Sequence, residues 1–126
     1  MSGADRKLLG RWGEAMAAQE LRRRGWKIIG AGWQCRHGEI DLIATNRKYI
    51  SFTEVKLRKN ANYGQAREFV DRHKQQRLII SAQLYLSEHP TKLQPRFDVM
   101  EIYAPEGVNT QNPAYTFIEN AFEVVK

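Results

Sequence analysis

Residues 38–56, GEIDLIATNRKYISFTEVK, predict a β-hairpin that decides the fold of the chain. Two apolar-rich stretches flank a polar turn, which is typical of two antiparallel strands joined by a short connection. Side chains alternate between the two faces of a strand, so Glu54 and Lys56 share a face with Phe52. Asp41 falls opposite Phe52 or Glu54, depending on the register, and both registers place the two acids on the same side of the hairpin. Charged groups are therefore expected among apolar ones at the depth of the sheet.

The remaining elements surround this hairpin in a simple order. The spacing of apolar residues predicts helices over residues 5–24 and 65–87, stopped by Gly25 and Pro90. Further strands are predicted over residues 26–34, 96–104 and 115–122. This order predicts an α/β fold with a mixed central sheet of about five strands, in which the second helix crosses from the hairpin to a parallel strand. Helices are expected to cover both faces of the sheet.

Length and composition are those of an ordinary globular protein. The chain has 126 residues, of which 42% are hydrophobic and 27% charged, and we expect a single domain over residues 1–126. No apolar run approaches the ~20 residues of a membrane span, and the first residues lack a signal-peptide core. We therefore expect a cytoplasmic protein without a membrane partner. The lone Cys35 cannot form an internal disulfide, and we assign it no role.

The charge balance favours a polyanionic partner. Lys and Arg number 20 against 14 Asp and Glu, a formal charge of +6 with a pI near 9.7. Nucleic acid, with DNA first, is the expected partner, while the alternative is a solvated basic surface that keeps a small protein in solution. The candidate nucleic-acid contacts are Arg23, Arg24, Arg58, Lys59, Lys74 and Arg77. The last two are solvated helix charges unless the second helix borders the site.

Two carboxylates that converge at sheet depth repel each other, so both stay ionised only with a cation between them. Oxygen ligands without His or Cys favour Mg²⁺ or Mn²⁺ over zinc. The candidate ligands are Asp41, Glu54 and the backbone carbonyl of Val55, whose side chain points to the other face. Lys56 would orient or deprotonate a water and offset the charge of a scissile phosphate. The alternative is an exposed strand pair linked by salt bridges.

Two further acids have two interpretations each. Glu14 aligns along the first helix with Ala18 and Leu21, a row that is otherwise small or apolar. It is either a third carboxylate of the metal site or an exposed helical glutamate. Glu39 shares the face of Asp41 but lies toward the start of the strand, so it either supports the site or serves the turn.

Six motifs along nearly the whole chain resemble one known family. They are GRWGEAMAAQELRRRGWKII, GEIDLIA, FTEVKLR, VDRHKQQRL, AQLYL and RFDV. Together they resemble the YraN-like family, which is similar to the PD-(D/E)XK nuclease superfamily and most closely to the archaeal Holliday junction resolvases. The resemblance implies a restriction-endonuclease-like core. It assigns the metal-holding Asp, the Glu-x-Lys pair and the helix Glu to Asp41, Glu54, Lys56 and Glu14. Ile40 stands where the superfamily name has Pro, and it faces away from the acids.

The same resemblance implies a function and its partners. It predicts a metal-dependent endonuclease that hydrolyses DNA phosphodiesters, including branched recombination or repair intermediates. A homodimer would suit a two-fold symmetric junction. Because a fold does not determine a reaction, the alternatives are a non-catalytic nucleic-acid-binding module and an adaptor for another DNA-processing protein.

Overall fold

The structure, a computed structural model, describes residues 2–60 and 71–122. Its elements follow in the order α1 Gly3–Arg23, β1 Lys27–Cys35, β2 Gly38–Thr45, β3 Tyr49–Arg58, α2 Arg72–Glu88, β4 Gln94–Tyr103, the short 3-10 helix η2 Gly107–Asn109, and β5 Ala114–Phe122.

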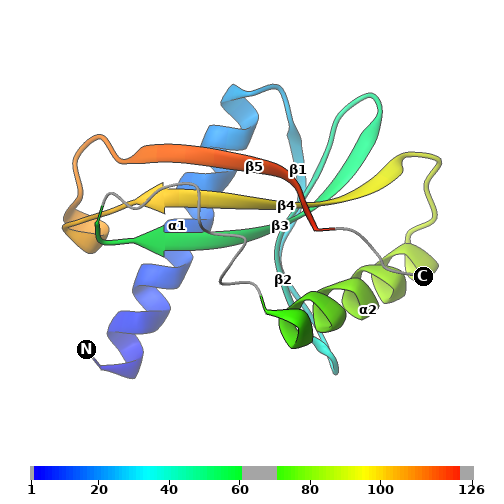
Figure 1. The fold of residues 1–126 in the computed structure, drawn as a ribbon, viewed down its shortest axis with the longest axis horizontal. Helices are drawn as coiled ribbons and strands as arrows, with labels where there is room; N and C mark the ends of the chain where they lie inside the picture. The colour runs from blue at the N-terminus through cyan, green and yellow to red at the C-terminus, as the bar shows by residue number, and fades with distance from the viewer. Residues whose placement is uncertain (1, 61–70, 123–126) are drawn as a thin grey trace.

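The strands form one sheet in the order β1-β2-β3-β4-β5 (Figure 1). The β3–β4 pair is parallel and the other pairs are antiparallel. A parallel neighbour requires a crossover, and α2 lies in that connection. The predicted α/β fold with a mixed five-stranded sheet and a restriction-endonuclease-like core is confirmed.

Helix α1 begins with a capping box that the sequence prediction did not use. The Ser2 side chain accepts from the Asp5 backbone N–H, and the Asp5 side chain accepts from that of Ser2, so α1 starts at Gly3. At the other end, Gly25 has φ +94°, a left-handed conformation that suits glycine and stops the helix as predicted.

The start of α2 differs from the prediction. Asp71 has an extended backbone, and its side chain accepts from the Lys74 backbone N–H, so the helix begins at Arg72. The predicted helix from Gln65 is therefore wrong at Asp71, where the backbone is extended. The apolar spacing continues across this residue and does not reveal that it is an N-cap. Residues 65–70 of the predicted helix lie outside the described residues.

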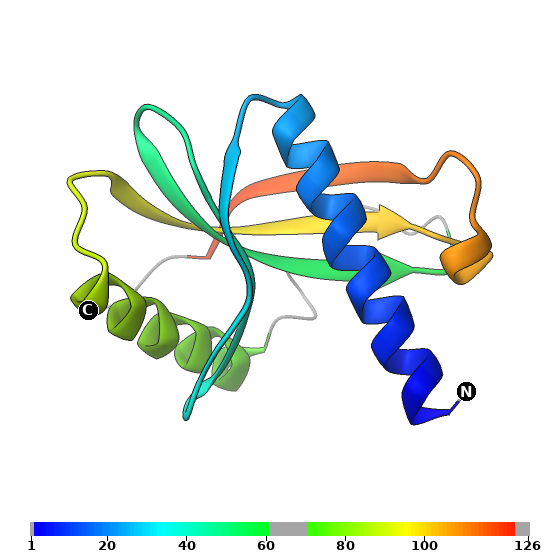
Figure 2. The same ribbon diagram turned by 180° about the vertical axis from the view of Figure 1, so that it is seen from behind.

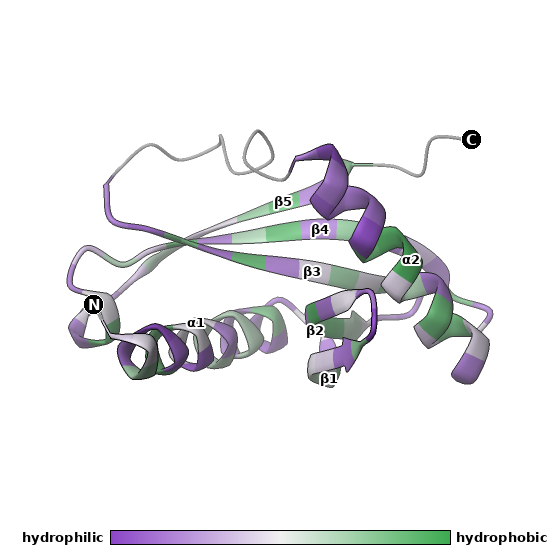
Figure 3. Cartoon of the chain, turned by 90° about the horizontal axis from the view of Figure 1, so that it is seen from below, coloured by the Kyte–Doolittle hydropathy of each residue, from purple (hydrophilic) through white to green (hydrophobic). Residues whose placement is uncertain are grey.

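The two helices pack on opposite faces of the sheet (Figures 2 and 3). Buried residues of α1 pack with Leu42, Ala44, Met100 and Ile102. Those of α2 pack with Ile43, Ile50, Phe52 and Phe97. Glycine lets α1 approach closely, since a Cβ on Gly13 would lie 3.2 Å from the side chain of Leu57 in β3. None of the described helices is long and apolar enough to cross a membrane.

A buried ionic cluster ties the start of β3 to β4 and β5. Asp98 is fully buried and accepts from Ser51 Oγ at 2.5 Å, from the Asn120 backbone N–H at 2.8 Å and from Arg96 Nε at 3.0 Å. The Arg96 guanidinium lies over the rings of Tyr49 and Trp26, with centroid distances of 4.6 and 5.0 Å. Each donor and acceptor in this part of the core therefore depends on its neighbours.

Candidate functional site

The site begins where β2 leaves β3. The last paired residues of this ladder are Leu42 and Thr53, and beyond them the Asp41 carboxylate accepts from the Val55 backbone N–H at 2.9 Å. The side chain of Asp41 thus takes the place of the next main-chain acceptor. Continuing the register places Asp41 opposite Glu54, which is one of the two predicted arrangements.

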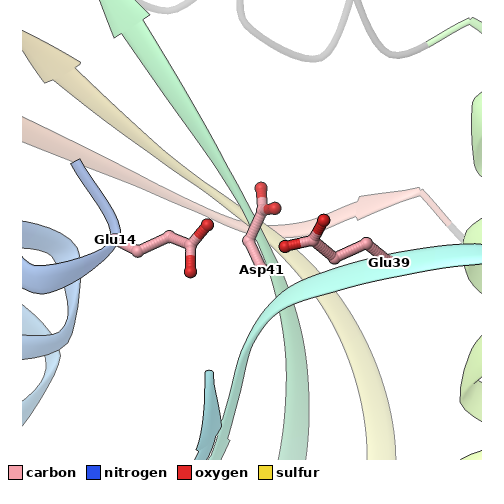
Figure 4. Close-up of side chains that lie close together, drawn as sticks. All are labelled: Glu14, Glu39 and Asp41. Atoms are coloured by element: carbon pink, nitrogen blue, oxygen red, sulfur yellow. The ribbon is translucent and has the colours of Figure 1, made fainter. Parts of the chain in front are cut away.

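Three carboxylates converge at this fork. Glu14, Glu39 and Asp41 each offer an oxygen that lies within 4.8 Å of the other two (Figure 4). Glu14 comes from α1, whereas Glu39 and Asp41 come from β2. The structure therefore brings Glu14 to Asp41, as the metal-site interpretation predicted, and it also places Glu39 in the cluster rather than in the turn alone.

Burial and neighbouring acids raise the pKa values of two carboxyl groups at the fork, Asp41 and Glu14. Burial, followed by the charge of Glu54, raises the pKa of Asp41 from 3.8 to about 7, although the Val55 N–H acts in the opposite direction. Burial and then the charges of Glu39 and Glu54 raise the pKa of Glu14. Both shifts mean that the cluster favours added positive charge, which either a proton or a metal ion can supply.

The carboxylate of Glu54 lies beside this cluster and forms ion pairs with two lysines. Lys74 Nζ of α2 forms an ion pair with Glu54 Oε1, and Lys56 Nζ lies 3.7 Å from the same oxygen. Burial lowers the pKa of Lys56, and the neighbouring Lys74 cation lowers it further. Burial also lowers the pKa of Lys74, but its hydrogen bond to Glu54 and the charge of that acid raise it more, so its net shift is upward.

A pocket of about 510 Å³ opens above these groups. Its lining comprises Arg36, His37, Gly38, Glu39, Asp41, Glu54, Lys74, Arg77 and Leu78. Acids of β2 and β3 thus face cations of α2 across the pocket. Helix α2 does border the site, which is the condition under which Lys74 and Arg77 become candidate contacts for a substrate.

Val55 has the orientation that a main-chain ligand needs. Its side chain packs in the core beneath α1, and its N–H points to Asp41. The N–H and C=O of one strand residue point to the same edge, so its carbonyl faces the fork as well.

The residues present fit a hard divalent cation. The clustered donors are carboxylates, which Mg²⁺ and Mn²⁺ prefer. Burial, together with neighbouring acids, raises the pKa values of Asp41 and Glu14, so a bound cation would stabilise their ionised forms. Glu14, Glu39 and Asp41 could hold such an ion, with Glu54 and the Val55 carbonyl adjacent.

Four of the six cations predicted to contact nucleic acid are paired with acids. Glu20 pairs with Arg23 and Arg24 at 2.6 and 2.7 Å. Arg58 pairs with buried Glu101 at 3.3 Å, and Lys74 pairs with Glu54. Lys59 and Arg77 are exposed. A nucleic-acid role for any of the six stays a prediction.

The structure also shows a cationic surface that the sequence prediction missed. A shallow pocket of about 610 Å³ lies at the far end of β2, and its lining includes Lys27, Arg47 and Lys48. Lys27 is the first residue of β1, whereas Arg47 and Lys48 lie in the turn between β2 and β3, so no single basic run in the sequence marked the surface.

Gly32 is a second feature that sequence reasoning missed. Its φ is +62°, and a Cβ there would lie 3.3 Å from Glu39 Oε1 and 3.5 Å from Glu14 Oε1. The missing side chain therefore leaves room for the converging carboxylates. The available signal was a glycine inside a strand, which often marks a close approach.

Replacing Gly32 by alanine is expected to lower the free energy of unfolding by about 1–2 kcal/mol, because the left-handed backbone is strained for a residue with a Cβ. It should also weaken Mn²⁺ binding by pushing Glu14 and Glu39 apart. Chemical denaturation and calorimetry measure the two effects. Gly3→Ala is the control, since nothing lies within 4 Å of its Cβ position. Equal stability and equal Mn²⁺ affinity of both variants would contradict this role.

Residues 13–102 match the uncharacterised protein family UPF0102. The chain is 42% identical to a UPF0102 protein of Caldanaerobacter subterraneus, over 97% of this chain and 100% of the relative. It is 42% identical to one of Alcanivorax borkumensis, over 93% of each chain, and 38% identical to one of Pseudomonas aeruginosa, over 90% of this chain and 91% of the relative. These matches confirm the resemblance that the motifs indicated: the chain belongs to the UPF0102 family, the YraN-like proteins.

Proposed function

We propose that the chain is a divalent-metal-dependent nuclease that hydrolyses DNA phosphodiester bonds. The observation that carries the proposal is the convergence of Glu14, Glu39 and Asp41, whose oxygens lie within 4.8 Å of one another beside a pocket with cations on its other wall. Burial and neighbouring acids raise the pKa values of Asp41 and Glu14, which is a costly arrangement for stability alone. Metal binding by the cluster would explain why the protein tolerates this loss of stability.

Each group has a part in this reaction. A bound Mg²⁺ or Mn²⁺ would supply the positive charge that polarises a phosphodiester oxygen. Asp41 and Glu14 would hold the ion, with Glu54 and the Val55 carbonyl completing the ligands. Lys56 would orient the attacking water and take its proton, and the downward shift of its pKa, caused first by burial, makes its ammonium easier to deprotonate for this role. Arg77 would hold the phosphate from the opposite wall of the pocket.

The substrate within this class follows from the resemblance to Holliday junction resolvases. We extend the proposal to branched recombination or repair intermediates. A homodimer would present two such pockets to the two strands of a symmetric junction. The cationic surface of Lys27, Arg47 and Lys48 supports a long nucleic-acid footprint, because it lies at the far end of the strand that carries Asp41.

Replacing Glu54 by glutamine is expected to lower cleavage of labelled four-way junction, flap or duplex DNA in Mn²⁺ by about 100-fold or more, because a metal ligand contributes several kcal/mol to transition-state stabilisation. Lys56→Met should lose activity as well. Glu106→Gln is the matched control, since it removes an exposed acid of the loop before η2. Initial rates from denaturing gels are the measurement.

Two outcomes would count against the proposal. Equal cleavage by the parent chain and by Glu54→Gln would place the activity in a contaminating nuclease. DNA binding without cleavage in either metal would instead favour a non-catalytic nucleic-acid-binding module.

A further inference from the structure

Glu54 stands apart from the three clustered carboxylates because a lysine of another element holds it. Lys74 Nζ is paired with Glu54 Oε1, the same oxygen that lies 3.7 Å from Lys56 Nζ. The Glu54 side chain is 6% exposed and that of Lys74 is 36% exposed, so the pair runs from the inner wall of the pocket to its opening. Lys74 occupies this oxygen and the Lys56 ammonium lies close by, so the two positive charges oppose the approach of a metal ion to Glu54.

The first turn of α2 places Lys74 over the pocket. Asp71 caps the helix by accepting from the Lys74 backbone N–H at 2.8 Å, which sets the first turn over the pocket. Arg77 follows three residues later and lines the same pocket. Two cations of one helix thus face the acids, but the ion pair to Glu54 is formed by Lys74.

We propose that Lys74 is a positioning residue that withholds Glu54 from the metal until a DNA phosphate in the pocket takes over its ammonium group. The inference rests on the nuclease function proposed above. A phosphate oxygen is as strong a partner for an ammonium as a carboxylate is, so the exchange conserves the ion pair. Glu54 is then free to join Asp41 at the fork. The metal site would be complete only with substrate present.

The consequence is a test that needs neither DNA nor catalysis. In the full chain without DNA at pH 8, Lys74→Met is expected to bind Mn²⁺ about tenfold more tightly than the parent protein in calorimetry, equivalent to about 1.4 kcal/mol. Arg77→Met is the matched control, because it removes one positive charge from the same pocket without releasing Glu54. Its affinity should change by less than about threefold, as expected for a solvent-screened charge. Lys74→Arg, which keeps a cation, should resemble the parent.

The outcomes separate this inference from the nuclease proposal. Mn²⁺ binding by the parent with unchanged or weaker binding by Lys74→Met would overturn the inference and leave the metal site intact. An equal gain in Lys74→Met and Arg77→Met would also overturn it, since net charge alone would then be responsible. Absence of Mn²⁺ binding in all variants would overturn both proposals. Thermal unfolding of each variant shows that loss of binding is not loss of fold.

A second measurement follows the lysine itself. Saturating Mn²⁺ without DNA should leave Lys74 paired with Glu54, so the rate of reductive methylation of Lys74, measured by mass spectrometry, should stay unchanged. Lys92 is exposed on the loop before β4 and should be unaffected. Faster labelling of Lys74 in Mn²⁺ alone would contradict the proposal, because the metal would then displace the lysine without a DNA phosphate.

Discussion

Replacing Asp98 by alanine is expected to lower the free energy of unfolding by about 3–5 kcal/mol, the range for removing one partner of a buried ion pair. Asp98 accepts from Ser51, Arg96 and the Asn120 backbone, and all three donors lose this acceptor in the variant. The Arg96 guanidinium, whose side chain is 8% exposed, would keep the carboxylate of Glu119 at 3.3 Å and its contacts with the rings of Tyr49 and Trp26, but it would lose its buried acid partner. Urea unfolding followed by tryptophan fluorescence is the measurement.

Glu119→Ala provides a matched control for this prediction. Its carboxylate contacts the same guanidinium but is 60% exposed, so its removal should cost less than about 1 kcal/mol. If alanine at position 98 prevents folding altogether, Asp98→Asn keeps an acceptor for Ser51 and Asn120 and should show an intermediate loss. Losses of equal size in Glu119→Ala and the Asp98 variants would show that burial does not govern the strength of the cluster.

Replacing Asp41 by asparagine is expected to have opposite effects on stability and on metal binding. Asparagine retains an acceptor for the Val55 N–H but removes the charge that Glu14 and Glu54 repel. The metal-free protein should therefore become more stable at pH 8. Mn²⁺ affinity should fall by more than about 100-fold, beyond what is typical for the loss of a residue that only supports a ligand. Calorimetry and urea unfolding in EDTA measure the two quantities.

The gain in stability should depend on pH in a defined direction. The pKa of Asp41 is raised from 3.8 to about 7 on folding, so the parent protein loses stability as the pH rises through this window. The shift corresponds to at most about 4 kcal/mol above pH 7. The advantage of Asp41→Asn over the parent should thus be larger at pH 8 than at pH 5.

Glu106→Gln is the control for a general effect of charge, since this acid is exposed and belongs to neither the carboxylate cluster nor the pocket lining. An advantage of Asp41→Asn that does not grow between pH 5 and pH 8 would contradict the electrostatic origin of the shift. A variant that binds Mn²⁺ as the parent does would show that Asp41 is no ligand. The combination of higher stability and lost binding is expected where a functional site is built at the expense of stability.

Local patterns were sufficient for most elements of the fold. Alternation in β2 and β3 predicted Asp41, Glu54 and Lys56 on one side of the hairpin, and Gly25 marked the end of α1. The predicted start of α2 was wrong because the apolar spacing continues through Asp71, whereas the helix begins after this N-cap residue. Capping is a contact between a side chain and the next turn, so periodicity alone does not reveal it.

The sequence by itself determined the order of the elements and the faces of the hairpin, because both follow from the period of apolar residues and from turn chemistry. Only the tertiary structure decided which distant groups meet at the fork. Glu14 reaches Asp41 because Gly13 lets α1 approach β3, Gly32 leaves room for the carboxylates, and Lys74 takes Glu54 because α2 crosses above the pocket. Such contacts depend on the separation of β2 from β3 and on the packing distance of two helices, and neither is encoded in any single segment of the chain.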